Sequence, residues 1–276
     1  MIKKIITLFK LGRKIAHSDI LEIISKFQKP PLAIKLLFKF LGISFSPKKK
    51  NLIKSEGERL SDSLESMGTT FIKLGQFLAT RPDIIGESLS KQLENLQDKL
   101  PPFSLIQAKE IIKNDLGQET YDSIINLSEP VAAASIAQVH KAQINDNGTI
   151  KDVAIKILRP NIKKIFNDEI DAIMLFAFLV ESFIKKTKRL KLVEVVFLLK
   201  EITNLEMDLR FEAAAANEYA ENTKNDVGFR VPEIYWNFTN ENVMTLDWVD
   251  GISIRETGEL KKRNLDTEKI ANDIIQ

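Results

Sequence analysis

The sequence of 276 residues contains no cysteine and only two histidines, His17 and His140. The lack of cysteine excludes disulfides, thiolate metal sites and cysteine nucleophiles. Two histidines are too few for a multi-histidine metal centre. Hydrophobic residues make up 44% and charged residues 28% of the chain, which is the composition of an ordinary globular protein. The length suits one large domain or two small ones.

Long apolar segments are also lacking. The longest uninterrupted apolar run, Ala172–Val180, has nine residues, whereas a membrane-spanning helix needs about 20. The N-terminus is basic and apolar, but it lacks the apolar core and small-residue cleavage site of a secretory signal. We therefore expect no transmembrane span and a cytoplasmic chain whose basic N-terminus could lie on a membrane surface.

Acidic residues are scarce in the first 54 residues, which hold 13 Lys and Arg against 2 Asp and Glu and carry a net charge of +11. The remaining 222 residues hold 27 against 36 and carry −9. Cations alternate with Ile, Leu and Phe in residues 3–15, a pattern typical of an amphipathic segment on an anionic membrane surface. The alternative is a short helix packed on the body with solvated lysines. Nucleic acid is not an expected partner, because the body is acidic and few aromatic residues lie among the cations.

Hydrophobic spacing divides the rest of the chain into helices and strands. Apolar residues recur every three or four positions across 55–81, which predicts one helix ending before Pro82. An Asn-Asp-Asn-Gly turn at 145–148 separates two apolar segments and predicts a β-hairpin. Further helices are expected over 86–98, 104–115, 161–186, 191–220 and from 266, and strands over 135–144, 152–158, 230–236 and 243–249. This arrangement predicts an α+β fold.

A glycine lies in the middle of the first predicted helix. Gly75 costs about 1 kcal/mol there relative to alanine, which indicates close approach of another element. Lys73 and Gln76 are three residues apart and therefore share one face of this helix. For Lys73 taken alone, a solvated surface lysine is the alternative.

The strongest local signal is Val153-Ala154-Ile155-Lys156. A lysine on a rigid strand supplies a point charge to phosphate oxygens, and protein kinases use it in this context. Upstream, residues 132–139 keep the spacing of a kinase Gly-rich loop, with alanine at each of the three glycine positions and Val139 at the end. Because alanine does not readily take a positive φ, this loop must curve differently. A buried strand with a terminal lysine is the alternative.

An acidic segment, Glu206 to Glu212, provides a partner for such a lysine. Kinases pair the strand lysine with a helix glutamate, and Asp208 and Glu212 are four apart on one helix face. Glu206 faces elsewhere unless the helix distorts. A solvated charged face is the alternative. The strand end Leu246-Asp247-Trp248-Val249-Asp250-Gly251 resembles a kinase hinge, whose backbone amides bind adenine.

These motifs together resemble the UbiB family of atypical protein-kinase-like proteins, also called the AarF or ADCK family, of the bacterial ubiquinone-biosynthesis type. Lys73-Leu74-Gly75-Gln76 is similar to the family's KxGQ motif, and Glu206-Met207-Asp208 to its ExD motif. The Ala-rich loop and the VAIK strand lie between them in the family's order. The resemblance covers about residues 55–276.

The resemblance implies a kinase-like N-lobe, a small antiparallel sheet with helices, preceded by a helical extension whose KxGQ helix lies over the active-site cleft. Lys73 would approach Glu206 and Asp208, and Lys156 would serve the phosphates with Glu212 as its partner. The cofactor would be ATP or ADP with Mg²⁺. The nucleotide-binding residues implied are Val131, Ala132, Ala133, Ala134, Ser135, Ile136, Ala137, Gln138, Val139, Lys156 and Val249, with Lys73, Gln76, Glu206, Asp208 and Glu212 in support.

The second half of a kinase is not found in the sequence. His17-Ser18-Asp19 precedes the nucleotide loop and has Ile24 where a catalytic loop has asparagine. Asp146-Asn147-Gly148 has Asp-x-Gly letters but forms the hairpin turn, and Asp226-Val227-Gly228 precedes the hinge strand, where no metal-binding loop belongs. We therefore expect no catalytic or metal-binding residue in this chain.

The resemblance implies that the catalytic-loop aspartate would lie beyond Gln276, the last residue of the sequence. We accordingly expect a largely absent C-lobe. The expected segments are a basic arm (1–54), a helical extension (55–128), the N-lobe (129–258) and the start of the C-lobe (259–276).

Three functions are compatible with this sequence. The first is an ATP-dependent atypical kinase or ATPase supporting ubiquinone biosynthesis, whose other half is supplied by a separate chain or is missing from the given sequence. The second is a non-catalytic nucleotide-lobe protein that binds a membrane or partners. The third is a helical membrane-surface protein without a nucleotide role. The resemblance implies ubiquinone-biosynthesis enzymes or lipid precursors as partners, and we expect nucleotide binding weaker than micromolar.

Overall fold

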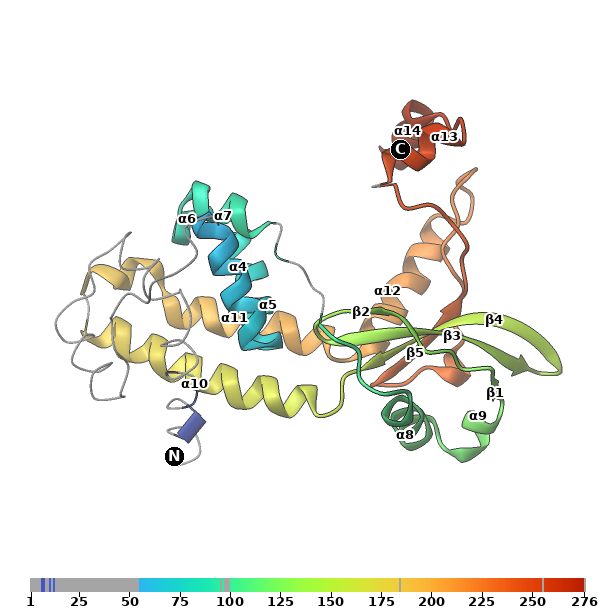
Figure 1. The fold of residues 1–276 in the computed structure, drawn as a ribbon, viewed down its shortest axis with the longest axis horizontal. Helices are drawn as coiled ribbons and strands as arrows, with labels where there is room; N and C mark the ends of the chain where they lie inside the picture. The colour runs from blue at the N-terminus through green and yellow to red at the C-terminus, as the bar shows by residue number, and fades with distance from the viewer. Residues whose placement is uncertain are drawn as a thin grey trace. The chain divides into compact units, whose positions relative to one another are not determined.

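The computed structural model divides the chain into two compact units (Figure 1). It describes residues 6, 7, 10, 12, 55–94, 96, 100–183, 185–254 and 256–275. The predicted basic arm therefore lies almost wholly outside the described residues, and so does Gln276, beyond which the catalytic-loop aspartate is expected. The first unit comprises residues 1–102, 133–137 and 159–207, and the second comprises residues 103–132, 138–158 and 208–276.

The first unit is helical. Its elements are α4 (Glu56–Met67), α5 (Thr69–Ala79), α6 (Pro82–Ile85), α7 (Glu87–Leu93), α10 (Ile162–Phe183), a 3-10 turn (Lys185–Leu190) and α11 (Leu192–Glu206). Helices α10 and α11 run side by side, and α5 packs on both (Figure 1). The core consists of apolar side chains of α4, α5 and α7 with Ala172 of α10. None of the helices described in either unit is both long and apolar enough to span a bilayer.

The predicted helix over 55–81 is interrupted at Gly68. This glycine has φ +102° and ψ −174°, a conformation that side-chain-bearing residues rarely adopt, so it ends α4 and begins α5. Ser55 and Glu58 form a capping box at the start of α4, as is typical of a helix N-terminus. The apolar period nevertheless continues across the break, because Leu64, Met67 and Phe71 are all buried in one core.

Gly75 marks a close approach, as the sequence predicts. A Cβ at this position would lie 2.6 Å from Leu96 Cδ2 and 2.7 Å from Leu64 Cδ1. Both leucines are buried in the core of the first unit. A side chain at position 75 would therefore displace two packed methyl groups.

Replacing Gly75 with valine should lower the free energy of unfolding by about 1–3 kcal/mol, the usual cost of overpacking a filled core. The matched control is Gly258→Val in α13, where a Cβ would meet nothing within 4 Å. That control should change stability by less than about 0.5 kcal/mol. Urea denaturation followed by circular dichroism measures both. Equal stability of the two variants would contradict the close approach.

The second unit combines a five-stranded sheet with helices. Its strands are β1 (Ile124–Ile125), β2 (Pro130–Ala133), β3 (Ala137–Asp146), β4 (Thr149–Leu158) and β5 (Val243–Asp247), in the order β1-β3-β4-β5 with β2 beside β3. Its helices are α8 (Leu105–Leu116), α9 (Gln118–Asp122), α12 (Leu209–Asn222), α13 (Thr257–Lys262) and α14 (Thr267–Ile275), with a 3-10 turn at Trp236–Phe238. Ala108 and Ile112 of α8 pack on the buried side chains of β3, β4 and β5. The α+β prediction is confirmed.

The predicted β3–β4 hairpin is present. Asn147 and Gly148 have φ of +51° and +88° at its turn, which suits the asparagine-glycine pair. Strands β4 and β5 pair antiparallel, with Lys156 opposite Met244 and Val153 opposite Asp247. The boundaries differ slightly from prediction, since β3 starts at Ala137 and β4 at Thr149.

Three other predicted elements are wrong in extent. The helix over 191–220 breaks between α11 and α12, because Asp208 accepts a hydrogen bond from Arg210 N and caps a new helix. The strand over 230–236 is reduced to one bridge, Ile234 to Leu246. Pro232 has no N–H for a ladder, and the chain turns at Trp236. The helix over 86–98 ends at Leu93.

Candidate functional site

Lys156 and Glu212 form an ion pair within the second unit. Lys156 Nζ lies 2.6 Å from Glu212 Oε1 and 2.7 Å from Oε2. Strand alternation buries Val153, Ile155 and Ile157 and leaves Lys156 on the other face of β4. The two side chains are 25% and 48% exposed. The ammonium is therefore held in one position and remains accessible to a ligand.

Helix α12 brings Glu212 to this lysine. Leu209 and Ala213 are fully buried and flank Glu212 in sequence, and α12 packs on β5. Leu209 N donates to Glu241 O, 3.0 Å away, which fixes the first turn of the helix. The helix partner that the sequence predicts for Lys156 is thus present, although its helix begins at Leu209 rather than at 191.

The Ala-rich segment forms a tight turn between β2 and β3. Ala134 N donates to Ala137 O at 2.8 Å. None of residues 131–139 has a positive φ, so no position in this turn requires glycine. Val131 and Ala132 are exposed, whereas Ser135 to Gln138 are buried. The loop thus curves without glycine conformations, as its alanines predict.

Gln138 faces the interior of the second unit. Its Oε1 accepts from Phe103 N at 2.9 Å, and its Nε2 donates to Phe103 O at 3.2 Å. The same Nε2 lies 2.8 Å from His140 Nε2, and His140 Nδ1 lies 2.7 Å from Ser128 O. Because a carbonyl only accepts, Nδ1 carries the proton of a neutral imidazole and Nε2 accepts from Gln138. These contacts indicate that the Gln138 side chain stabilises the fold around β3.

Burial lowers the pKa of His140. The hydrogen bond with Ser128 O and the charge of Glu129 raise the pKa, but burial is the larger effect. In the unfolded chain a histidine binds a proton near pH 6.5, whereas in the folded chain His140 binds one only at lower pH. The stabilisation by neutral His140 is therefore complete above pH 6.5 and is lost as pH falls through the folded pKa. We expect His140→Gln to flatten the decline of unfolding free energy between pH 6.5 and 5. Parallel slopes in wild type and variant would contradict this.

Lys73 and Glu206 form a second ion pair, in the first unit. Lys73 Nζ lies 2.8 Å from Glu206 Oε2, and the two side chains are 13% and 40% exposed. Gln76 follows on α5 and is half-buried. The KxGQ lysine and the first ExD acid, predicted to approach each other, are thus brought together by packing of α5 on α11.

Asp208 lies beyond the break that follows α11. Its carboxylate accepts from Arg210 N at 3.1 Å, from Arg210 Nε at 2.9 Å and from Arg210 Nη2 at 2.6 Å. The sequence suggests a face shared by Asp208 and Glu212 on one helix. The structure instead makes Asp208 the N-cap of α12, one position before its first helical residue.

The hinge-like segment follows β5 in the second unit. Trp248 N donates to Asp152 O at 3.1 Å, and the next residue, Val249, has an exposed side chain. Partial burial raises the pKa of Asp247, but hydrogen bonds from Tyr235 Oη, Glu233 N and Arg230 hold the pKa below its ordinary value. Burial and the same carboxylate raise the pKa of Tyr235. Asp247 is therefore a charged anchor for the strand that leads to Val249.

Comparison with known proteins agrees with this arrangement. The family described as the ABC1 atypical kinase-like domain matches residues 95–276, which include the loop, both Lys156 and Glu212, and the hinge-like segment. The chain belongs to the ABC1 family. The match covers most of the chain, so the family assignment does not depend on any single motif.

Three curated relatives, each named "Probable protein kinase UbiB", are similar over most of this chain. The protein of Marinobacter nauticus is 34% identical over 242 residues, which cover 87% of this chain and 43% of the relative. That of Cellvibrio japonicus is 35% identical over 218 residues (79% and 39%), and that of Vibrio cholerae 36% over 220 residues (79% and 40%).

The chain spans about two fifths of the length of these relatives. More than half of each relative therefore has no counterpart in residues 1–276, which agrees with the expected absence of a C-lobe from this sequence. That the catalytic-loop aspartate lies beyond Gln276 stays a prediction, because the match with the relatives does not locate that residue.

The residues present fit part of the nucleotide set that ABC1 membership suggests. An accessible ammonium held by a carboxylate suits phosphate oxygens. Among the described residues, however, no group of three or more His, Cys, Asp or Glu could hold a metal ion.

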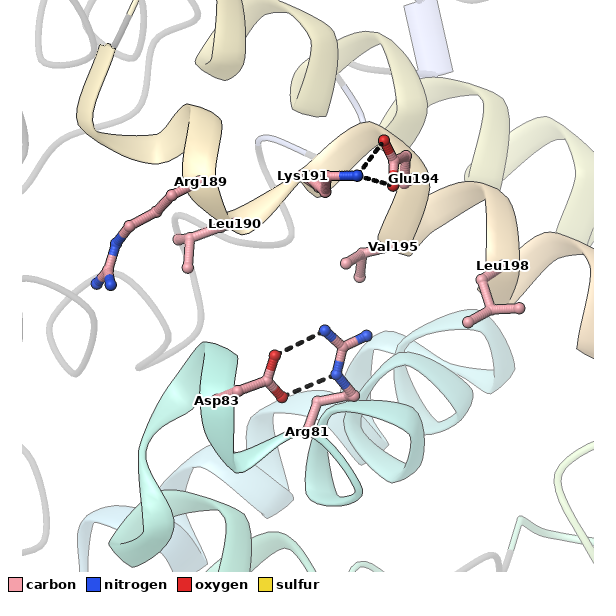
Figure 2. A pocket seen from close by; sticks show the side chains of 8 residues that line it. All are labelled: Arg81, Asp83, Arg189, Leu190, Lys191, Glu194, Val195 and Leu198. Atoms are coloured by element: carbon pink, nitrogen blue, oxygen red, sulfur yellow. Dashed lines mark hydrogen bonds and ion pairs between the residues drawn. The ribbon is translucent and has the colours of Figure 1, made fainter.

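A separate pocket of about 410 Å³ lies in the first unit (Figure 2). It is lined by Arg81, Asp83, Arg189, Leu190, Lys191, Glu194, Val195 and Leu198. Arg81 pairs with Asp83, and Lys191 pairs with Glu194, as the dashed lines show. Two of the three cationic side chains that line the pocket are therefore paired with acidic side chains of the same lining. None of the site residues predicted from the sequence lines this pocket.

Two residues outside the predicted set contact the Ala-rich loop. Arg159 donates to Ala134 O, and Thr69 donates to Ser135 O. A weak signal for Arg159 exists in the sequence, since it follows Lys156 by three residues and precedes Pro160, which restricts its backbone to extended conformations. No sequence signal points to Thr69, because its partner lies 66 residues away.

Proposed function

We propose that this chain carries the nucleotide-binding part of a UbiB-type atypical kinase that uses ATP and supports ubiquinone biosynthesis. The observation that carries this proposal is the pairing of Lys156 with Glu212, at 2.6 and 2.7 Å. The family assignment and the three relatives named "Probable protein kinase UbiB" support it.

Lys156 would bind the phosphates. Glu212 holds the ammonium over β4, and charge-assisted hydrogen bonds to phosphate oxygens are stronger than neutral ones. An incoming phosphate would share the ammonium with the carboxylate. ATP, when bound, supplies the phosphoryl group, and the chain's own residues bind and orient it.

Val249 would lie at the adenine. It follows the end of β5, and the strand before it is held by Asp247 and by the hydrogen bond from Trp248 N to Asp152 O. The segment that follows β5 would offer backbone N–H and C=O groups to a base edge. Its apolar, exposed side chain suits contact with a flat ring.

Lys73 and Glu206 would act apart from nucleotide binding. Their ion pair engages one oxygen of the first ExD acid, so a ligand of that oxygen would compete with Lys73. This supports a role of the KxGQ helix in controlling access to Glu206.

The proposed location is the surface of the inner membrane. The charge of +11 in residues 1–54 supports attraction to anionic lipid, worth about 1 kcal/mol for each cation near the surface. Enzymes or lipid precursors of ubiquinone biosynthesis are the proposed partners, and a separate chain supplying the C-lobe is a further proposed partner. Vesicle flotation with and without anionic lipid tests the surface contact, which the proposal expects only with anionic lipid.

Nucleotide binding by the intact chain tests the proposal directly. A fluorescent ADP analogue should bind saturably, and ATP should displace it while inorganic phosphate at the same concentration should not. Thermal shift with ATP provides a second readout, since a ligand that binds only the folded state raises the melting temperature. Absence of both effects at millimolar ATP would overturn the proposal.

A further inference from the structure

Three consecutive carbonyls of the Ala-rich loop accept hydrogen bonds from outside the loop. Ala134 O accepts from Arg159 Nε at 2.9 Å, Ser135 O from Thr69 Oγ1 at 2.9 Å, and Ile136 O from Arg159 N at 2.8 Å. All of these residues belong to the first unit. Two residues, Arg159 and Thr69, thus determine where this stretch of backbone lies.

Arg159 connects the loop to a second backbone segment. Its Nη1 donates to Pro101 O at 2.9 Å and its Nη2 to Leu100 O at 3.1 Å, while its Nε reaches Ala134. A guanidinium has a rigid planar fork of donors, so one side chain can hold three carbonyls at fixed separations. A lysine ammonium cannot reproduce this geometry from one atom on a flexible stem.

Thr69 connects the loop to the KxGQ helix. It is the first residue of α5, its hydroxyl is buried, and Ser135 is fully buried. Thr69 and Lys73 are four residues apart and therefore lie on one face of α5. The helix that pairs with Glu206 through Lys73 also holds the loop through Thr69.

We propose that Arg159 and Thr69 are positioning residues that hold the Ala-rich loop in its nucleotide-binding conformation. A Gly-rich loop closes on its ligand by bending, whereas this loop has no glycine and no positive φ. Hydrogen bonds from Arg159 and Thr69 hold the loop in this conformation before a ligand binds. This lowers the conformational-entropy cost of binding. This inference rests on the proposed nucleotide function of the loop.

Hydrogen exchange of the intact chain tests the positioning without any nucleotide. In Arg159→Lys and Thr69→Val, the Ala134 amide should exchange about tenfold faster or more, because a loop carbonyl loses its partner. Amides of α10 should exchange as in wild type. The matched controls are Arg81→Lys, which alters a guanidinium paired with Asp83, and Thr80→Val, which removes a hydroxyl donating to Phe77 O. Unchanged exchange at Ala134 in both variants would overturn the inference, whatever the chain binds.

Nucleotide affinity provides the functional readout. Apparent affinity falls with the fraction of molecules whose loop is competent, so we expect the ADP-analogue dissociation constant to rise about tenfold in Arg159→Lys and Thr69→Val. Thr69→Ser keeps the hydroxyl and should restore both affinity and exchange. Loss of binding in Lys156→Met with unchanged binding in Arg159→Lys would refute positioning while leaving the proposed function intact. A wild type that binds no nucleotide would refute the proposed function, and with it the nucleotide role of the loop.

Discussion

Replacing Lys156 with methionine should lower the affinity for ATP by about 10- to 150-fold, because a hydrogen bond to a charged group contributes about 1.5–3 kcal/mol. Methionine keeps the length and the apolar stem of lysine and removes only the ammonium. The Lys156–Glu212 pair is partly exposed, so its loss should change stability by no more than about 1 kcal/mol. Competition with a fluorescent ADP analogue measures the affinity, and circular dichroism confirms the fold.

The matched control is Lys151→Met on the same strand. Lys151 Nζ lies 4.9 Å from the centre of the Tyr235 ring and 3.6 Å from Glu233 Oε2, away from the Glu212 pair. This control should change the affinity by less than about twofold, the size of a remote charge effect. Equal losses in both variants would show a general electrostatic effect and would contradict a phosphate role for Lys156. Glu212→Gln should give an intermediate loss, because Lys156 keeps its charge but not its fixed position.

Replacing Gln138 with methionine should lower the free energy of unfolding by about 3 kcal/mol or more. The side chain is 1% exposed and serves three partners, Phe103 N, Phe103 O and His140 Nε2. Methionine fills a similar volume but satisfies none of them, and each buried polar group left unpaired costs about 1–3 kcal/mol. Chemical denaturation of the intact chain measures the loss.

Gln143→Met provides the comparison for Gln138. Gln143 lies on the same strand, is half-buried, and bonds to the side chains of Asn126 and Asp152. Water can replace these bonds, so we expect a change below about 1 kcal/mol. A stable Gln138→Met variant with weakened nucleotide binding would instead support Gln138 as a ligand-binding residue, as the resemblance implies.

Much of the second unit could be predicted because its signals are local. Asn147 and Gly148 specify the hairpin turn through their positive φ. The alternation of β4 buries Val153 and Ile155 and exposes the face that carries Lys156. In the first unit, Gly75 in a helix predicted a close approach, which Leu64 and Leu96 confirm. The breaks in two predicted helices were not predicted, because the apolar spacing continues across Gly68 and across Asp208.

The chain's sequence alone determined its family, its α+β class and the lysine and acids that form the candidate site, because motifs and periodicity depend on neighbouring residues. Only the tertiary structure decided that Lys156 meets Glu212, 56 residues away, and that Lys73 meets Glu206. It also decided that Gln138 faces inward and that Arg159 and Thr69 hold the loop. Such pairs form when packed helices and strands bring side chains that are distant in sequence within about 3 Å of each other. The spacing of residues along the chain does not indicate which distant side chains will meet in this way.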